Sequence, residues 1–191
     1  MTESFKVVTI GQSGVGKTSI VQTYIGGSFK DDIAPTVGIG YSLCKLIVEE
    51  KTIMLNIWDT ASQEKYAPLI PFYVRGADLV LLVYDLSNIE SLIAIKDYYE
   101  KLLDILSDEV NIVLCGNKFD LSLRSLKDVE EWAHENKISS FVVSAKTNTG
   151  LDILFRHIAE KCLDIKENRE RKKNEVYQFN TGDDTGSRGC C

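Results

Sequence analysis

The segment Gly11–Thr18, which reads Gly-Gln-Ser-Gly-Val-Gly-Lys-Thr, limits the fold of this 191-residue chain more than any other feature. It lies between a short apolar run, Phe5–Ile10, and a run of helical character, Thr18–Tyr24. Two glycines separated by four residues, then Lys and Thr, are typical of a loop that cradles phosphate between a strand and a helix. The glycines let backbone N–H groups point at phosphate oxygens, and the helix adds its positive N-terminal end. The sequence therefore predicts a strand–loop–helix unit that binds phosphate.

The residue types of this loop suit both a phosphate and a metal ion. Lys17 supplies a point charge for the outer phosphates, and the Thr18 hydroxyl can ligate Mg²⁺. The alternative interpretation is a glycine-rich turn that binds nothing. If the loop does bind phosphate, the residues that surround the ligand are expected to be Ser13, Gly14, Val15, Gly16, Lys17, Thr18 and Ser19.

Short apolar runs alternate with longer helical patterns along the chain. The runs are almost unbroken by polar residues, as strands buried on both faces should be, and they cover Phe5–Ile10, Leu79–Tyr84, Asn111–Cys115 and Phe141–Val143. Helical patterns, with apolar residues three or four apart, cover Thr18–Ile25, Ser91–Leu106, Leu126–Asn136 and Leu151–Ile165. Strands that alternate with helices predict a parallel sheet.

One pair of apolar runs lacks a helix between its members. Tyr41–Val48 and Thr52–Trp58 are joined by Glu49-Glu50-Lys51, which predicts an antiparallel hairpin. We therefore expect an α/β fold of three layers, with about five helices and a six-stranded mixed sheet of five parallel strands and one antiparallel edge strand. Ligands of such sheets bind outside the carboxyl ends of the strands.

Composition excludes several functional classes. The length favours one domain, and the net charge of −6, without a basic block in the body, argues against nucleic acid as a partner. The sequence shows neither a charged-then-apolar leader nor an apolar run of about eighteen residues, so we expect neither secretion nor a membrane span. Cys44, Cys115 and Cys162 lie in apolar segments without metal-ligand spacing, which predicts core thiols in a reducing cytosolic compartment.

The apolar period stops after Ile165, which predicts a domain of residues 1–165 and a disordered tail over 166–191. The tail holds six basic and five acidic residues, a difference too small to bind an anionic membrane by charge alone. It ends in Gly189-Cys190-Cys191, and exposed thiols are a reactive liability. Because two lipid chains anchor stably where one does not, lipidation of Cys190 and Cys191 is the favoured interpretation.

Polar residues follow three of the predicted strands. Asp59, in Trp58-Asp59-Thr60, is placed to hold Mg²⁺ directly or through water, with a helix cap or a surface charge as the alternative. The Asp120 carboxylate of Asn117-Lys118-Phe119-Asp120 can accept hydrogen bonds from the ring N–H and exocyclic amine of guanine, which adenine lacks there. The alternative for this segment is a simple turn. Ser144-Ala145-Lys146 can offer a backbone N–H to the guanine oxygen.

These four elements together resemble the Ras superfamily of small GTPases over about residues 5–165. The resemblance implies that the chain binds GTP or GDP with Mg²⁺ and hydrolyses GTP slowly to GDP and phosphate. It implies metal ligation by Thr18, Thr36 and Asp59, charge stabilisation by Lys17, and orientation of the attacking water by Gln63. It further implies that Phe29 lies against the base, that Ser62 lies at the γ-phosphate, and that the guanine pocket consists of Asn117, Lys118, Asp120, Ser144, Ala145 and Lys146.

Other segments are similar to the Rab branch of that superfamily. Tyr73–Ala77 and Lys51–Gln63 resemble Rab segments, Leu69–Tyr73 is similar to the early-endosome group, and the two terminal cysteines are similar to the geranylgeranylated end of many Rabs. The resemblance implies a monomeric switch in vesicle trafficking that recruits effectors and cycles between the cytosol and the cytoplasmic face of intracellular, endosomal membranes. Its implied partners are an exchange factor, a GTPase-activating protein, and prenylation and extraction chaperones.

Two residues depart from the family pattern. Ser62 stands where the family has a glycine whose N–H swings to the γ-phosphate, and a Cβ restricts that motion. Ser13 places a side chain beside the same phosphate. These departures motivate one alternative function, a nucleotide-locked scaffold with little hydrolysis. A second alternative, a P-loop nucleotide kinase, needs an adenine site, and Asn117–Asp120 argues against it.

Overall fold

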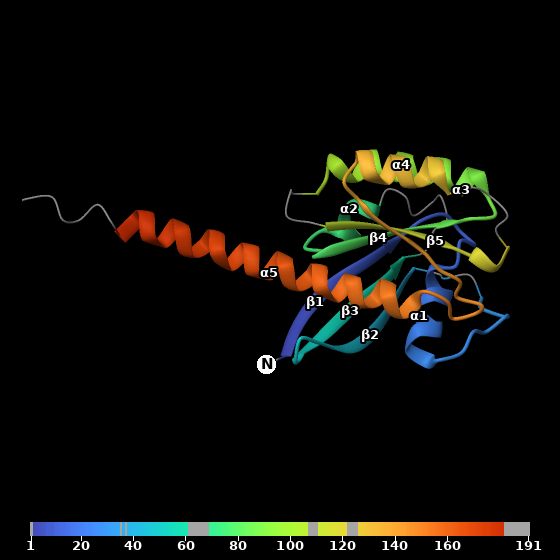
Figure 1. Cartoon of the computed structure of the whole chain (residues 1–191), viewed down its shortest axis with the longest axis horizontal. Helices are drawn as coiled ribbons and strands as arrows, with labels where there is room; N and C mark the ends of the chain where they lie inside the picture. The colour runs from blue at the N-terminus through green and yellow to red at the C-terminus, as the bar shows by residue number, and fades with distance from the viewer. Residues whose placement is uncertain are drawn as a thin grey trace, which may run out of the picture.

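The computed structural model describes residues 2–34, 36, 38–60, 69–106, 111–121 and 126–181, with side chains up to residue 175. This part of the chain contains six strands and five α-helices (Figure 1). In chain order they are β1 (Thr2–Ile10), α1 (Lys17–Gly26), β2 (Ile39–Val48), β3 (Lys51–Thr60), α2 (Ile70–Val74), β4 (Leu79–Asp85), α3 (Ile89–Leu103), β5 (Asn111–Asn117), α4 (Lys127–Glu135), β6 (Ser139–Val142) and α5 (Leu151–Thr181). Each strand and helix for which the sequence predicted a range is present, and α2 is an additional short helix.

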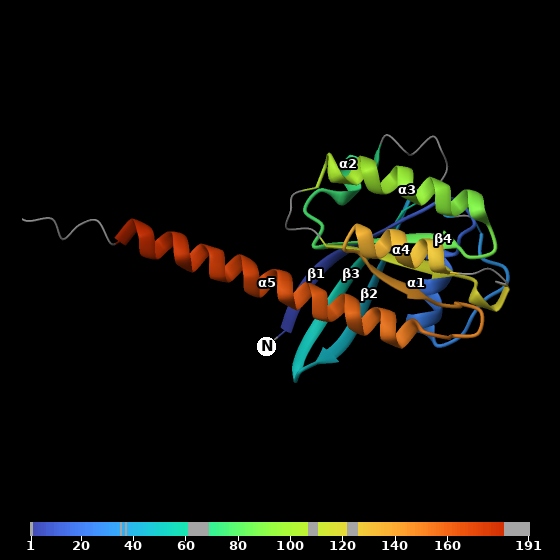
Figure 2. The same ribbon diagram turned by 45° about the horizontal axis from the view of Figure 1, so that its top comes forward.

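The six strands form one sheet in the order β2-β3-β1-β4-β5-β6. β2 pairs antiparallel with β3, and every other pair of neighbours is parallel. The predicted mixed sheet with one antiparallel edge strand is therefore confirmed. Helices α1 and α5 cover one face of the sheet and α2, α3 and α4 cover the other, which gives the three expected layers (Figures 1 and 2).

Each face of the sheet has its own hydrophobic core, because successive side chains of a strand point to opposite faces. In β1, Phe5 and Val7 pack in the core beneath α1 and α5, whereas Val8 and Ile10 pack in the core beneath α3 and α4. All seven residues of β4 are buried, and its first six, Leu79–Tyr84, form the apolar run that the sequence shows. Three buried thiols lie in the first core, as expected: Cys44, Cys115 and Cys162.

The hairpin between β2 and β3 turns more tightly than its sequence indicates. Val48 pairs with Lys51, so the turn consists of Glu49 and Glu50 alone. Their φ angles are 48° and 63°, and positive φ at both central residues defines the type I′ turn, which normally takes Asn and Gly. The expected three-residue connection is therefore wrong by one residue, because two glutamates carry no signal for this turn.

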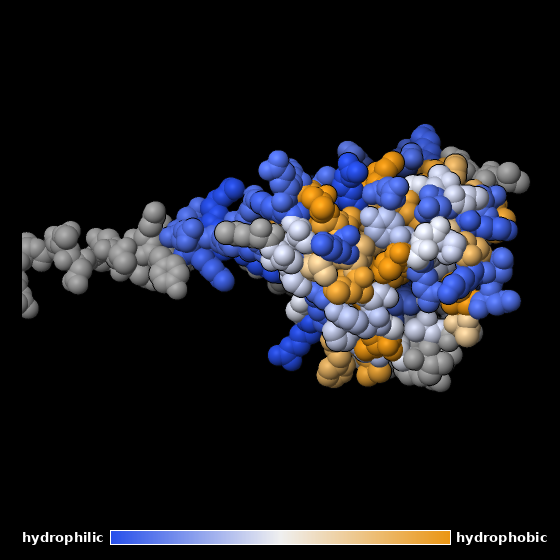
Figure 3. All heavy atoms as spheres, turned by 90° about the horizontal axis from the view of Figure 1, so that it is seen from below, coloured by the Kyte–Doolittle hydropathy of each residue, from blue (hydrophilic) through white to orange (hydrophobic). Residues whose placement is uncertain are grey.

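The last helix, α5, continues past Ile165 to Thr181 and projects from the body (Figure 1). The expectation of a disordered tail is thus wrong for residues 166–181, while 182–191 lie outside the described residues. The first half of the helix, residues 151–165, is nucleated by packing its apolar face on the sheet, and each further residue adds one hydrogen bond without a new nucleus. Lys, Arg and Glu, which form its hydrophilic surface in Figure 3, are also good helix formers.

Ion pairs fasten the beginning of this helical extension to the body. The three pairs are Lys166–Glu3, Glu167–Lys51 and Arg169–Asp78. Asp78 is held in turn, since its second carboxylate oxygen accepts the backbone N–H of Lys6 at 2.8 Å. The partner residues lie at the beginnings of β1 and β3 and just before β4, far along the chain from α5, so no local sequence pattern could reveal them.

Candidate functional site

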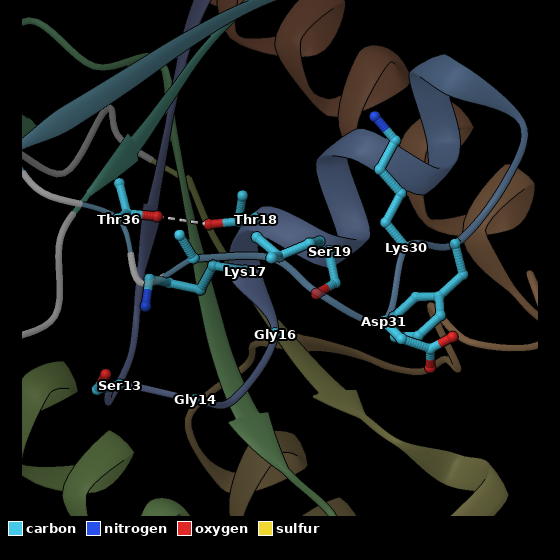
Figure 4. Close-up of a pocket in the computed structure, with 12 residues that line it drawn as sticks. Ser13, Gly14, Gly16, Lys17, Thr18, Ser19, Lys30, Asp31 and Thr36 are labelled. Atoms are coloured by element: carbon cyan, nitrogen blue, oxygen red, sulfur yellow. Dashed lines mark hydrogen bonds between the residues drawn. The ribbon is translucent and has the colours of Figure 1, made fainter.

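The phosphate loop joins the end of β1 to the start of α1 at the carboxyl edge of the sheet, as predicted. Gly16 precedes α1 with φ of 95°, and a Cβ on it would lie 2.3 Å from Asn117 Nδ2, so only glycine fits. Among the described residues, no side chain caps this end of α1, and a helix N-terminus favours anionic ligands. The loop borders a cavity of about 230 Å³, which Figure 4 shows with its lining residues.

Lys17 is buried at the first position of α1, with 6% of its surface exposed. Its ammonium donates to the carbonyl oxygens of Gly11 and Gln12, both at 3.1 Å. Burial lowers the pKa of Lys17 to about 8, and the negative charge of Asp59 opposes this shift. The loop therefore surrounds a buried cationic group, which favours the binding of anionic phosphate oxygens at this place.

Three oxygens from separate segments meet beside this cavity. The hydroxyl of Thr18 lies 2.7 Å from that of Thr36 and 2.5 Å from Asp59 Oδ2, and Thr36 lies 3.4 Å from the same carboxylate oxygen. Asp59 is 4% exposed, and its other oxygen accepts from the Thr9 hydroxyl at 3.1 Å. We call Thr18, Thr36 and Asp59 the oxygen triad. Figure 4 shows the two threonine hydroxyls facing each other.

The donor set of the oxygen triad fits Mg²⁺. This ion prefers hard oxygen ligands and binds through one or two carboxylates together with substrate phosphates, rather than in an all-protein cage. One carboxylate and two hydroxyls at the edge of a phosphate cavity meet that description. The described residues contain no group of three His, Cys, Asp or Glu that could hold a metal without a ligand's help.

A second cavity, of about 160 Å³, lies between the loop that follows α1 and the ends of β5 and β6. Asn117 ties its walls together, because its amide donates to the Val15 carbonyl at 2.9 Å and accepts the Ala145 N–H at 3.1 Å. Asp120 Oδ1 accepts from the Ser144 hydroxyl at 2.5 Å. The predicted guanine-pocket residues thus meet in one place: Phe29, Asn117, Lys118, Asp120, Ala145 and Lys146 line the cavity, and Ser144 supports it.

The two cavities adjoin. Gly16, Ser19, Phe29 and Asp31 line both of them. A ligand with a planar base at one end and a chain of phosphates at the other can therefore occupy both at once. The shape of the two joined cavities matches a purine nucleotide.

Comparison with known proteins identifies the family. Residues 6–164 match the Ras family. The chain belongs to this family. It is also 31% identical to Ras-related protein Rab-21 of Rattus norvegicus, in an alignment of 204 positions that covers 98% of this chain and 92% of that relative. It is therefore a Rab-like small GTPase, an enzyme that binds GTP and hydrolyses it, and nothing favours the alternative of a scaffold or a nucleotide kinase.

The structure adds residues that the sequence did not indicate. Lys30, Asp31, Ile33 and Ala34 line the phosphate cavity, but they lie in a loop without a periodic pattern. Leu121 lines the purine cavity. Val15 is buried and contributes its carbonyl rather than a wall. Four predicted site residues lie outside the described residues: Ser62, Gln63, Cys190 and Cys191.

Proposed function

We propose that this Ras-family GTPase is a Mg²⁺-dependent switch in which the γ-phosphate of GTP fixes the segment around Thr36. The oxygen triad carries the proposal, because it joins the end of the phosphate loop, a separate loop and the tip of β3 at one point. Mg²⁺, when bound there, neutralises charge on the phosphate oxygens. Hydrolysis removes the γ-phosphate and with it the interaction that fixes Thr36, so the loop relaxes.

In this proposal each residue has a separate task. The loop from Ser13 to Ser19 surrounds the phosphates, and Lys17 stabilises the charge that develops on them. As the family resemblance implies, Gln63 orients the attacking water and Ser62 lies at the γ-phosphate. The segments 29–41 and 59–68 contain no arginine, so intrinsic turnover is slow and a GTPase-activating protein supplies the missing cation.

Substitution of Thr36 by alanine tests the switch. In the full-length parent protein, amide hydrogen exchange over residues 30–40 should be at least about tenfold faster with GDP bound than with a non-hydrolysable GTP analogue bound. The Thr36→Ala variant should show less than about a twofold difference between the two nucleotides, because its loop has no ligand for the metal. Thr52→Ala, at the opposite end of β3, is the matched control and should keep the tenfold difference. Equal exchange in both nucleotide states of the parent protein would contradict the proposal.

An exposed apolar strip next to this loop supports the recruitment of effectors. Ile39, Tyr41, Leu43 and Ile47 lie on β2 and are 39–74% exposed. The ring of Tyr41 packs edge-on against Trp58 of β3, with centroids 6.2 Å apart. A strip of this kind gives an effector an apolar surface whose near end changes with the state of Thr36. We therefore place effector binding here, with an exchange factor acting on the same region.

The second part of the proposal concerns the membrane. None of the described helices has both the length and the apolar character of a membrane span. We propose geranylgeranyl anchors on Cys190 and Cys191, behind a GTPase domain of residues 1–165, with prenylation and extraction chaperones that let a monomer cycle between the cytosol and the cytoplasmic face of endosomal membranes. The resemblance of Leu69–Tyr73 to the early-endosome Rabs supports this compartment.

Mass spectrometry of the C-terminal peptide from cell-purified protein tests the anchor. We expect the mass of two geranylgeranyl groups on the peptide. Replacing both cysteines by serine should move the protein from the membrane to the cytosolic fraction. An unmodified peptide from the membrane-bound protein would contradict the proposal and show that the protein attaches to the membrane by other means.

A further inference from the structure

A carboxylate outside the purine cavity pairs with a residue that lines it. Asp85 is the last residue of β4 and pairs in register with Asn117 of the neighbouring strand. It does not line the cavity, but its Oδ2 lies 2.8 Å from the ammonium of Lys118, which does. Lys118 is therefore tied to β4, none of whose described residues lines either cavity.

Lys118 is constrained at both of its ends. Its backbone has φ of 64°, a left-handed conformation that is uncommon for lysine. Its ammonium is directed to Asp85. Between these two points the aliphatic stem has little freedom, although a lysine side chain normally has many rotamers. The stem can then form a fixed apolar surface of the cavity, which Phe29 also lines.

Asp85 is itself held in place. It is 8% exposed, and its second oxygen accepts both the N–H of Ser87 at 2.9 Å and the Ser87 hydroxyl at 2.6 Å. Burial raises the pKa of Asp85, but the hydrogen bonds from Lys118 and Ser87 outweigh it, so the pKa lies below its ordinary value. The Ser91 hydroxyl accepts the N–H of Asp85 at 2.9 Å. A charged carboxylate with both of its oxygens bonded, at the end of a strand, is a rigid point of attachment.

We propose that Asp85 is a positioning residue for nucleotide retention: it fixes the Lys118 stem as a wall of the purine cavity and so slows the release of bound nucleotide. This inference rests on the proposed role of Lys118 in the purine cavity. It adds a determinant of affinity that lies one strand away from the nucleotide and acts through another side chain.

A double-mutant cycle in the full chain tests it, with the dissociation rate of a fluorescent GDP analogue as the readout. Asp85→Asn keeps the shape and the acceptor for Ser87 but removes the charge, and should raise the dissociation rate about tenfold. Lys118→Met keeps the apolar stem without the ammonium and should raise the rate by a similar factor. The double variant should be no faster than either single variant, because both remove the same contact. Asp97→Asn, at an exposed position of α3, is the charge-matched control and should release nucleotide at the parent rate.

The possible results separate the hypotheses. An unchanged rate in Asp85→Asn would overturn the proposal, and so would effects that multiply in the double variant, since Asp85 would then act independently of Lys118. If Asp85→Asn does not fold, Lys118→Met alone decides, and an unchanged release rate in that variant overturns the proposal. A parent protein that binds no guanine nucleotide would instead contradict the proposed function.

Discussion

Substitution of Asp120 by asparagine should weaken the binding of guanine nucleotides by about 10⁴-fold. The carboxylate can accept two hydrogen bonds, one from the ring N–H and one from the exocyclic amine of guanine. An amide offers one acceptor and one donor, so its NH₂ group would face the amine of the base. Asp120 cannot turn away to relieve this conflict at little cost, because Ser144 holds one of its oxygens at 2.5 Å. A site built around a polar pair discriminates strongly when one member is wrong.

Competition against a fluorescent GDP analogue measures this effect. Xanthosine diphosphate carries an oxygen in place of the 2-amino group, so it can accept a hydrogen bond from the asparagine NH₂ group. It should compete better than GDP for the Asp120→Asn variant. Asp128→Asn, on the exposed side of α4, is the matched control and should bind GDP like the parent protein. GDP affinity that stays within tenfold of the parent value in Asp120→Asn would show that this carboxylate does not read the base.

The predictable part of the fold follows from burial. A strand such as β4, buried on both faces, is apolar over Leu79–Tyr84. The helices between the strands show their period because each covers only one face. Parallel strands also place their carboxyl ends at one edge. Polar segments after β1, β3 and β5 therefore had to meet, even though Thr18 and Asp59 are 41 residues apart.

The parts that were not predicted depend on contacts between distant residues or on unusual backbone angles. The extension of α5 is fastened by Glu3, Lys51 and Asp78, which no window around residue 166 contains. Asp85 follows the predicted apolar run Leu79–Tyr84, and only the pairing of β4 with β5 shows that it meets Lys118. The Glu49-Glu50 turn has positive φ angles without a glycine or an asparagine to indicate them. In each case the local sequence is compatible with several structures, and tertiary contacts select one.

Substitution of Gly11 by alanine should be the most damaging small change to the stability of the domain. A Cβ on Gly11 would lie 2.1 Å from the carbonyl oxygen of Val83 and 3.1 Å from its carbonyl carbon. Val83 is fully buried at the centre of β4, so the obstacle is backbone in a strand packed on both faces and not a flexible side chain. We expect the free energy of unfolding to fall by about 3 kcal/mol, at the upper end for overpacking of a core.

Gly26→Ala is the matched control, because the same methyl group at the end of α1 would meet nothing within 4 Å. There we expect the free energy of unfolding to change by no more than about 0.5 kcal/mol, with a small gain favoured by helix propensity. Urea unfolding at one fixed, saturating GDP concentration compares the variants, since bound nucleotide adds to the apparent stability. If Gly11→Ala loses less than about 1 kcal/mol, β1 and β4 can separate at the phosphate loop. The loop would then owe its shape to the bound phosphate rather than to the sheet.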